Sequence, residues 1–218
     1  MLRVSLAVAF ALSLGACATA NHTPISPESL ARLQGKSVQA TQYAQPDFAA
    51  FTAGKAAFAL VGAAMMISEG NEIVKENQIP DPAREISAGL QSRLSAGKGT
   101  KPLPNSKTSA QGADVAAIVA TNSGSDYILD VRTMSWMFNY YPADWAHYRV
   151  TYSAKVRLID AATKSVVAES ACTTVQGDDK NPPSKDQLLD NKAALLKSYL
   201  SKAATTCTDL LAREVLKL

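Results

Sequence analysis

The chain has 218 residues, a formal net charge of +3, three cysteines, two histidines and 47% hydrophobic residues. That length suits one domain with a substantial core, and a charged fraction of only 19% argues against a largely disordered chain. The small net charge gives no support for a nucleic-acid partner. Because cysteines and histidines are few, we also expect no metal site, and the sequence carries no cofactor motif.

The first residues have the organisation of an export signal. Arg3 supplies a positive charge, and Val4 to Leu14 is an uncharged, mostly apolar run of eleven residues. A helix needs roughly 20 apolar residues to span a bilayer, so this run is too short for a transmembrane segment. We therefore expect a signal peptide that is removed from the mature chain.

The run ends in Leu-Gly-Ala-Cys at positions 14–17, which resembles a bacterial lipobox. The resemblance implies that residues 1–16 are a lipoprotein signal peptide and that Cys17 becomes the acylated, palmitate-bearing first residue of the mature chain. Dual acylation of this kind anchors a protein stably to a membrane. Because Ala18 rather than aspartate follows the cysteine, the resemblance implies the periplasmic face of the outer membrane. The alternative is a simple secretory signal cleaved after Ala18 or Ala20.

The mature chain divides into a tether and one domain. Residues 17–35 contain Pro24 and Pro27 and no long apolar period, so they are expected to form the acylated cysteine and a tether with a short helix over residues 27–33. Residues 36–218 are expected to form a single α/β periplasmic domain, whose first strand spans Lys36 to Tyr43.

Ala56 to Ser68 is a run of thirteen residues without a charge. It is too short to cross a bilayer, and a buried helix with Phe58, Val61, Met65 and Met66 toward the core is the first interpretation. The alternative is a membrane-inserting or oligomerising helix, since its small residues permit close packing.

Asp81-Pro82 is a helix start, because aspartate caps free amide groups and proline suits the first helical position. Gly97 is the expected stop. Residues 97–111 then contain glycines, prolines and lysines but no acid, and we expect a basic flexible loop there. A short helix is expected over residues 114–121.

The second half of the chain carries the clearest strand pattern. From Tyr148 to Ile159 apolar and polar residues alternate strictly, which is typical of an antiparallel strand buried on one face. Residues 127–131 alternate similarly, residues 160–164 form a turn, and residues 165–175 return as the partner strand. These patterns predict an α+β fold with a small, mainly antiparallel sheet of about four strands, covered on one face by helices.

Ser184 to Gln187 has the spacing of a capping box and predicts the start of the last helix. One stripe of that helix is expected to lie on the sheet. The stripe consists of Leu188, Leu195, Tyr199, Ala203, Cys207, Leu210 and Val215.

The two remaining cysteines are expected to face one another. Glu169 should face water, which turns Cys172 of the return strand inward, and Cys207 lies on the helix stripe. We predict a Cys172–Cys207 disulfide, as suits an exported protein in an oxidising compartment. Two buried free thiols are the alternative, and the absence of a Cys-X-X-Cys pattern disfavours a catalytic redox pair.

The most unusual local feature is an aromatic cluster between the two long strands. Met134, Trp136 and Phe138 are in phase with Asp130 and Arg132, which should face solvent, so either a β-bulge changes the face or an apolar ridge lies outside. If exposed, the cluster is a partner-binding surface; otherwise it is a hairpin tip folded under the helix 56–68. The candidate contact residues are Trp136, Phe138, Tyr140, Tyr141 and Trp145.

A basic stripe is expected on the outer sheet face, formed by Arg132, Arg149, Lys155 and Arg157. Arg149, Lys155 and Arg157 are the candidates for binding an anionic glycan, although such a stripe is commonly only solvated. No hydrolase, phosphate-loop or zinc-helix motif is present, and neither histidine has a nearby nucleophile in the sequence. We expect a protein that is not an enzyme.

The stretch from Tyr152 to Glu169 reads as a strand, an aspartate-containing turn and a strand, followed by a helix. It resembles small envelope accessory lipoproteins of the curli-secretion and penicillin-binding-protein-activator type. The chain departs from a secretion pore because it lacks a pair of long amphipathic membrane hairpins. The resemblance implies an accessory protein with a membrane anchor at Cys17 and an envelope protein as partner. The alternatives are an oligomeric membrane-inserting or secretion-associated lipoprotein using residues 56–68, and a module for peptidoglycan or another anionic glycan.

Overall fold

The computed structural model describes residues 21–56, 59–105 and 114–218. The expected signal peptide, Cys17 and Phe58 lie outside the described residues, as do residues 106–111 of the expected basic loop. Within the described part of the chain, no helix is long and apolar enough to cross a membrane.

The described residues form one mixed sheet of six strands. Its order is β3 (Lys101–Leu103), β1 (Ser37–Ala40), β4 (Tyr127–Tyr141), β5 (Asp144–Asp160) and β6 (Ser165–Gln176), with β2 (Ala49–Phe51) also paired to β4. The strands β4, β5 and β6 pair antiparallel, whereas β1 and β2 each pair parallel with β4, and β3 pairs parallel with β1. The predicted sheet of about four mainly antiparallel strands is thus smaller than the observed one and lacks its parallel pairs. The strands β2 and β3 were not predicted because they have only three residues each and show no period of two.

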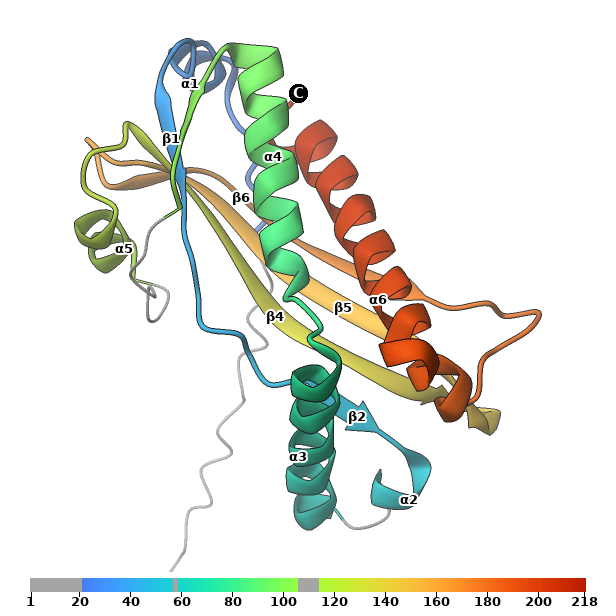
Figure 1. Cartoon of the computed structure of the whole chain (residues 1–218). Helices are drawn as coiled ribbons and strands as arrows, with labels where there is room; N and C mark the ends of the chain where they lie inside the picture. The colour runs from blue at the N-terminus through green and yellow to red at the C-terminus, as the bar shows by residue number, and fades with distance from the viewer. Residues whose placement is uncertain (1–20, 57–58, 106–113) are drawn as a thin grey trace, which may run out of the picture.

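Two long helices cover one face of the sheet. Figure 1 shows α4 (Pro82–Lys98) and α6 (Lys185–Leu210) side by side across β4, β5 and β6. Asp81 caps α4 by accepting a hydrogen bond from Ala83 N, and the helix ends at Gly99, two residues beyond the expected stop. Gly99 has a φ of 60°, which a glycine adopts without steric cost. The main core lies between these helices and the sheet.

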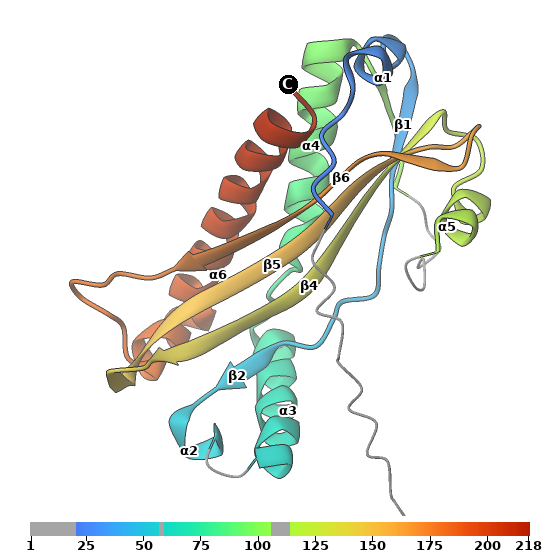
Figure 2. The same ribbon diagram turned by 180° about the vertical axis from the view of Figure 1, so that it is seen from behind.

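The opposite face is also covered at one end. Helix α5 (Val115–Thr121) places Ile118 against Ile128 and Ile159, and these three fully buried residues form a second, smaller core. Figure 2 shows α5 beside the start of β4, away from α4 and α6. The expectation that helices cover one face alone is therefore incomplete.

A β-bulge reverses the inward face of β4. Thr133 pairs with Ala154 and Ser135 pairs with Ser153, so Met134 is the extra residue. Before the bulge odd-numbered residues such as Val131 face the main core, and after it even-numbered residues such as Trp136 do. Of the two explanations for the shift in alternation, the bulge is the correct one.

The last helix does not continue in one phase. Residues 191–193 have positive φ values and break α6 shortly after its capping box, and a π-helical turn, η1 (Leu211–Val215), extends its end. Most of the predicted stripe faces the core: Leu188, Ala203, Cys207 and Val215 are buried, and Leu195 and Tyr199 are half-buried. Leu210 is exposed, and Leu196 and Leu200 are buried although they lie outside the predicted stripe. A count that assumes a continuous helix cannot anticipate these differences.

The segment expected to be a tether is attached to the domain from residue 23 onward. Thr23 exchanges two backbone hydrogen bonds with Glu169, at 2.7 and 2.9 Å, and Ile25 N donates to Val215 O at 2.8 Å. Helix α1 (Pro27–Arg32) follows, and Leu33 is fully buried. Glu169, expected to face water, is only 8% exposed and lies beside Lys155.

The predicted disulfide is present. Cys172 of β6 and Cys207 of α6 are both buried and joined, with Cα atoms 5.6 Å apart and a sequence separation of 35 residues. It links the final helix to the final strand, across the interface that forms the main core.

Replacing both cysteines, Cys172→Ser and Cys207→Ser together, should lower the free energy of unfolding by about 3–4 kcal/mol, because the crosslink restricts a long loop in the unfolded chain. Urea denaturation of the mature protein measures this loss, and the reduced wild type serves as the control for the hydroxyl groups. A loss below about 1 kcal/mol would contradict the role assigned to the disulfide.

Candidate functional site

The β4–β5 hairpin ends in an exposed aromatic tip. Trp145 is 67% exposed, and its Nε1 donates to Pro142 O at 3.1 Å, which fixes the indole to its own turn. Tyr140 is half-buried between Trp145 and Phe51, with ring centroids 6.3 and 5.9 Å away. The tip is therefore a braced aromatic surface.

Tyr141 belongs to the same tip. Its ring lies under the Arg149 guanidinium, with the Arg149 Cζ atom 5.4 Å from the ring centroid. Burial, together with the neighbouring Asp179 carboxylate, raises the pKa of the Tyr141 hydroxyl. Arg149, a candidate for binding an anionic glycan, thus packs on an aromatic ring and is half-buried.

The other two predicted contact residues lie in the core. Trp136 is 1% exposed and Phe138 is fully buried, and Phe48 packs against both rings edge-on, at centroid distances of 5.0 and 5.9 Å. The Trp136 Nε1 donates to Pro46 O at 3.2 Å, so the one polar atom of the buried indole has a partner. The bulge at Met134 is the reason, since it turns this part of β4 toward the core. The predicted contact surface is reduced to Tyr140, Tyr141 and Trp145.

Two residues of the predicted basic stripe are paired with acids. Arg157 is 6% exposed, and its Nη2 lies 2.6 Å from Asp130 Oδ2. Lys155 Nζ lies 2.5 Å from Glu169 Oε1. The hydroxyl of Tyr43 donates to Asp130 Oδ1 at 2.5 Å, so the chain after β1 helps to bury the Asp130–Arg157 pair. The outer face is therefore less basic than the sequence predicts.

Helix α3 (Ala59–Asn77) is longer than the run without charges, because it continues through Glu69 and Glu72 to Asn77. Met66 is buried, as expected, but Val61 is 68% and Met65 50% exposed. Gly70 packs directly on the backbone of Phe48, beside β2, where a side chain would clash. The charged half of α3 is thus the half that docks, and the apolar half leaves an exposed strip.

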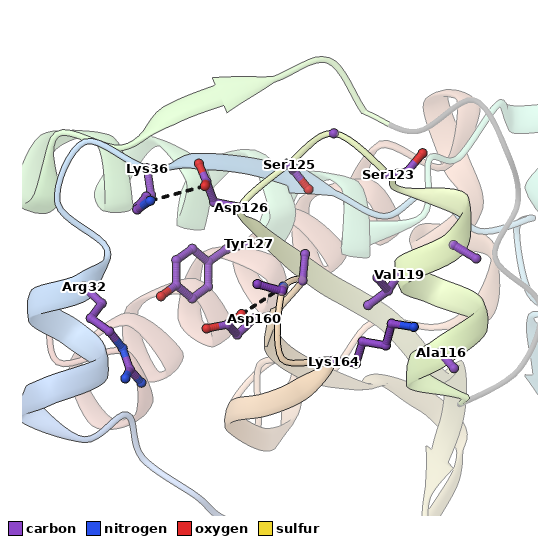
Figure 3. Close-up of a pocket in the computed structure, with 14 residues that line it drawn as sticks. Arg32, Lys36, Ala116, Val119, Ser123, Ser125, Asp126, Tyr127, Asp160 and Lys164 are labelled. Atoms are coloured by element: carbon purple, nitrogen blue, oxygen red, sulfur yellow. Dashed lines mark hydrogen bonds and ion pairs between the residues drawn. The ribbon is translucent and has the colours of Figure 1, made fainter.

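A second candidate site lies at the other end of the β4–β5 hairpin. It is an open cavity of about 780 Å³ between α1, α5, the start of β4 and the turn joining β5 to β6. Figure 3 shows Tyr127 and Asp160 at its floor, Arg32 and Lys36 on one side, and α5 with Val119 on the other. Lys164, from the β5–β6 turn, lies near α5.

Two acids fix the backbone around this cavity. Asp126 accepts hydrogen bonds from the backbone N and the hydroxyl of Ser37, at 2.8 and 2.7 Å, and these bonds are the main cause that lowers the pKa of its carboxyl. Asp160 Oδ1 accepts from Ala162 N and Thr163 N, at 3.0 and 3.1 Å. Both aspartates thus stabilise the loops that surround the cavity.

Sequence reasoning did not anticipate this cavity. Asp160 lies at the start of the expected turn 160–164, and Asp126 immediately precedes β4, but their neighbours come from distant parts of the chain. Tyr127 pairs with Asp160 across β4 and β5, while Arg32 arrives with the attached N-terminal segment. The spacing of residues within one segment of the sequence does not predict that these distant residues line one cavity.

No protein-family model matches the sequence, and no curated protein matches it significantly. Among solved structures, the chain is similar to the PelC dodecamer from Paraburkholderia phytofirmans, with 13% identity, a TM-score of 0.38, and 87% of this chain and 96% of that one covered. Hypothetical protein CT253 from Chlamydia trachomatis has 13% identity and a TM-score of 0.41, covering 83% and 95%. Lipoprotein GNA1162 from Neisseria meningitidis has 13% identity and a TM-score of 0.29, covering 78% and 96%. Similarity this low implies neither a shared function nor a shared assembly.

The two tryptophans should respond oppositely to truncation. Trp136→Ala is expected to cost about 3–5 kcal/mol of unfolding free energy, because it empties a fully buried aromatic site. Trp145→Ala should change stability by no more than about 0.5 kcal/mol, since the indole is mostly in water. Urea denaturation of both variants, with the wild type beside them, tests this assignment; equal losses would contradict it.

Proposed function

We propose that this chain is a lipid-anchored periplasmic accessory protein of the bacterial outer membrane, and that it acts by protein–protein contact rather than by catalysis. The lipobox-like sequence at positions 14–17 supports the anchor and the export route. The Cys172–Cys207 disulfide is in keeping with an oxidising compartment.

The observation that carries the contact role is the exposure of Trp145 on a braced hairpin tip. Tryptophan and tyrosine dominate binding energy at protein interfaces, because they bury large areas while losing little side-chain entropy. Tyr140 and the turn hold the indole in place, so little further ordering is needed when a partner binds.

Helix α3 supports a second candidate, an oligomeric membrane-inserting or secretion-associated lipoprotein. Val61 and Met65 are four residues apart, so both exposed side chains lie on one side of the helix. A mature protein that is monomeric in detergent and leaves dye-loaded vesicles intact would count against this candidate. The third candidate, a glycan-binding module, has less support, since Lys155 and Arg157 are engaged by Glu169 and Asp130.

In-cell crosslinking tests the contact role directly. A photoreactive amino acid at position 145 should give a discrete protein adduct, and the same probe at Met134 should not, although Met134 is also exposed, at 51%. Mass spectrometry of the adduct identifies the partner. Equal adducts at both positions, or none at position 145, would rule out the tip as the contact surface.

The anchor has its own test. Cys17→Ser should abolish incorporation of labelled palmitate and move the protein from the outer-membrane fraction to the soluble periplasmic fraction. Absence of palmitate label on the wild-type protein, or label that persists in Cys17→Ser, would refute lipid anchoring at Cys17. The crosslinking result at position 145 would stand independently of it.

A further inference from the structure

The cavity of Figure 3 brings opposite charges to one buried tyrosine. Arg32 and Asp160 lie on either side of Tyr127, a residue that is 3% exposed and lines the cavity. Arg32 is held from outside by Glu28 at 3.1 Å, and Asp160 is held by two backbone amides of its own turn. The two charges thus keep their places through bonds to other groups, with the cavity between them.

The Tyr127 hydroxyl is a hydrogen-bond donor at neutral pH. Burial is the main cause that raises the pKa of the Tyr127 hydroxyl. The Asp160 carboxylate raises this pKa further, and the Arg32 guanidinium lowers it. The protonated Tyr127 hydroxyl therefore adds a second hydrogen-bond donor, beside the Arg32 guanidinium, for the carboxylate of a ligand. The Asp160 carboxylate is an acceptor for an ammonium group on the same side of the cavity.

The remaining wall is apolar. Helix α5 contributes Ala116, Val119 and Ala120, and the β5–β6 turn contributes Ala161. A ligand with a charged group and a short apolar group could therefore place the first against Arg32 and Asp160 and the second against α5. Charges of both signs line the cavity: Lys36 and Lys164 accompany Arg32, and Lys36 Nζ lies 3.4 Å from Asp126 Oδ1. The Asp160 carboxylate is the group that favours a ligand with an ammonium over a simple anion.

We propose that this cavity binds a zwitterionic amino-acid group, as carried by a free amino acid or by an amino-acid side group of a larger molecule. The carboxylate accepts hydrogen bonds from Arg32 and Tyr127, the ammonium donates to Asp160, and the apolar body lies along α5. The site is at the opposite end of the β4–β5 hairpin from Trp145, so it does not depend on the proposed contact role.

Isothermal titration of the mature, acylated protein in detergent micelles tests the proposal with three probes. Leucine carries both charges, N-acetyl-leucine lacks the ammonium, and leucinamide lacks the carboxylate. We expect leucine to bind, and each derivative to bind at least about tenfold more weakly, since each loses its charged hydrogen bond to Arg32 or to Asp160.

Two variants assign the charges. Asp160→Asn keeps an oxygen for the amides of the turn but removes the charge, so it should weaken leucine about tenfold and leave N-acetyl-leucine unchanged. Arg32→Gln should weaken leucine and N-acetyl-leucine alike and leave leucinamide unchanged. Lys202→Ala, an exposed charge on α6, is the matched control and should change nothing.

The opposite results would overturn the proposal. If leucine at millimolar concentration produces no heat with a protein of unaltered melting temperature, the cavity is not an amino-acid site. If N-acetyl-leucine binds as tightly as leucine, the site recognises a simple anion, and the role assigned to Asp160 is wrong. If Asp160→Asn weakens all three probes equally, the aspartate serves only to stabilise the turn.

Discussion

The bulge at Met134 lets one long strand face the same core along its whole length. The early part of β4 buries Leu129 and Val131, and the later part buries Trp136 and Phe138, although the two sets are out of phase. Without the extra residue, the two large rings would point to the outer face, and Phe48 would lose both of its aromatic neighbours. The placement of the second half of the sheet therefore depends on one inserted position.

A buried polar cluster ties the bulge to the helix layer. The Thr133 hydroxyl, just before the bulge, contacts both the Asp81 carboxylate and, at 2.9 Å, the Tyr152 hydroxyl. Asp81 is also the cap of α4, and its burial raises the pKa of its carboxyl, which the hydrogen bonds from Thr133 and Ala83 oppose. The start of the helix and the irregularity in the strand are thus fixed by the same carboxylate, so neither shifts without the other.

How far the sequence predicts this molecule follows from the range of each interaction. The β5–β6 alternation, the capping box at Ser184 and the Asp81 cap are local patterns, and they identify their elements well. The Cys172–Cys207 pair was also within reach, because strand and helix phases are set locally. Three features have no local signature: the parallel pairing of β1 and of β2 with β4, the break at residues 191–193, and the placement of Arg32 and Asp160 at one cavity. They arise from long-range packing, which periodicity does not record.

The attachment of Thr23 to Glu169 changes how the domain is tethered under the proposed anchor. Eighteen steps along the chain separate Cys17 from residue 35, but only six separate it from Thr23, and a fully extended chain of six steps spans about 20 Å. The connection between the lipid and the folded domain would then be short. The edge strand β6 would remain close to the bilayer. The distance from the membrane at which a partner could bind the hairpin tip would be limited by this short connection and by the length of the sheet.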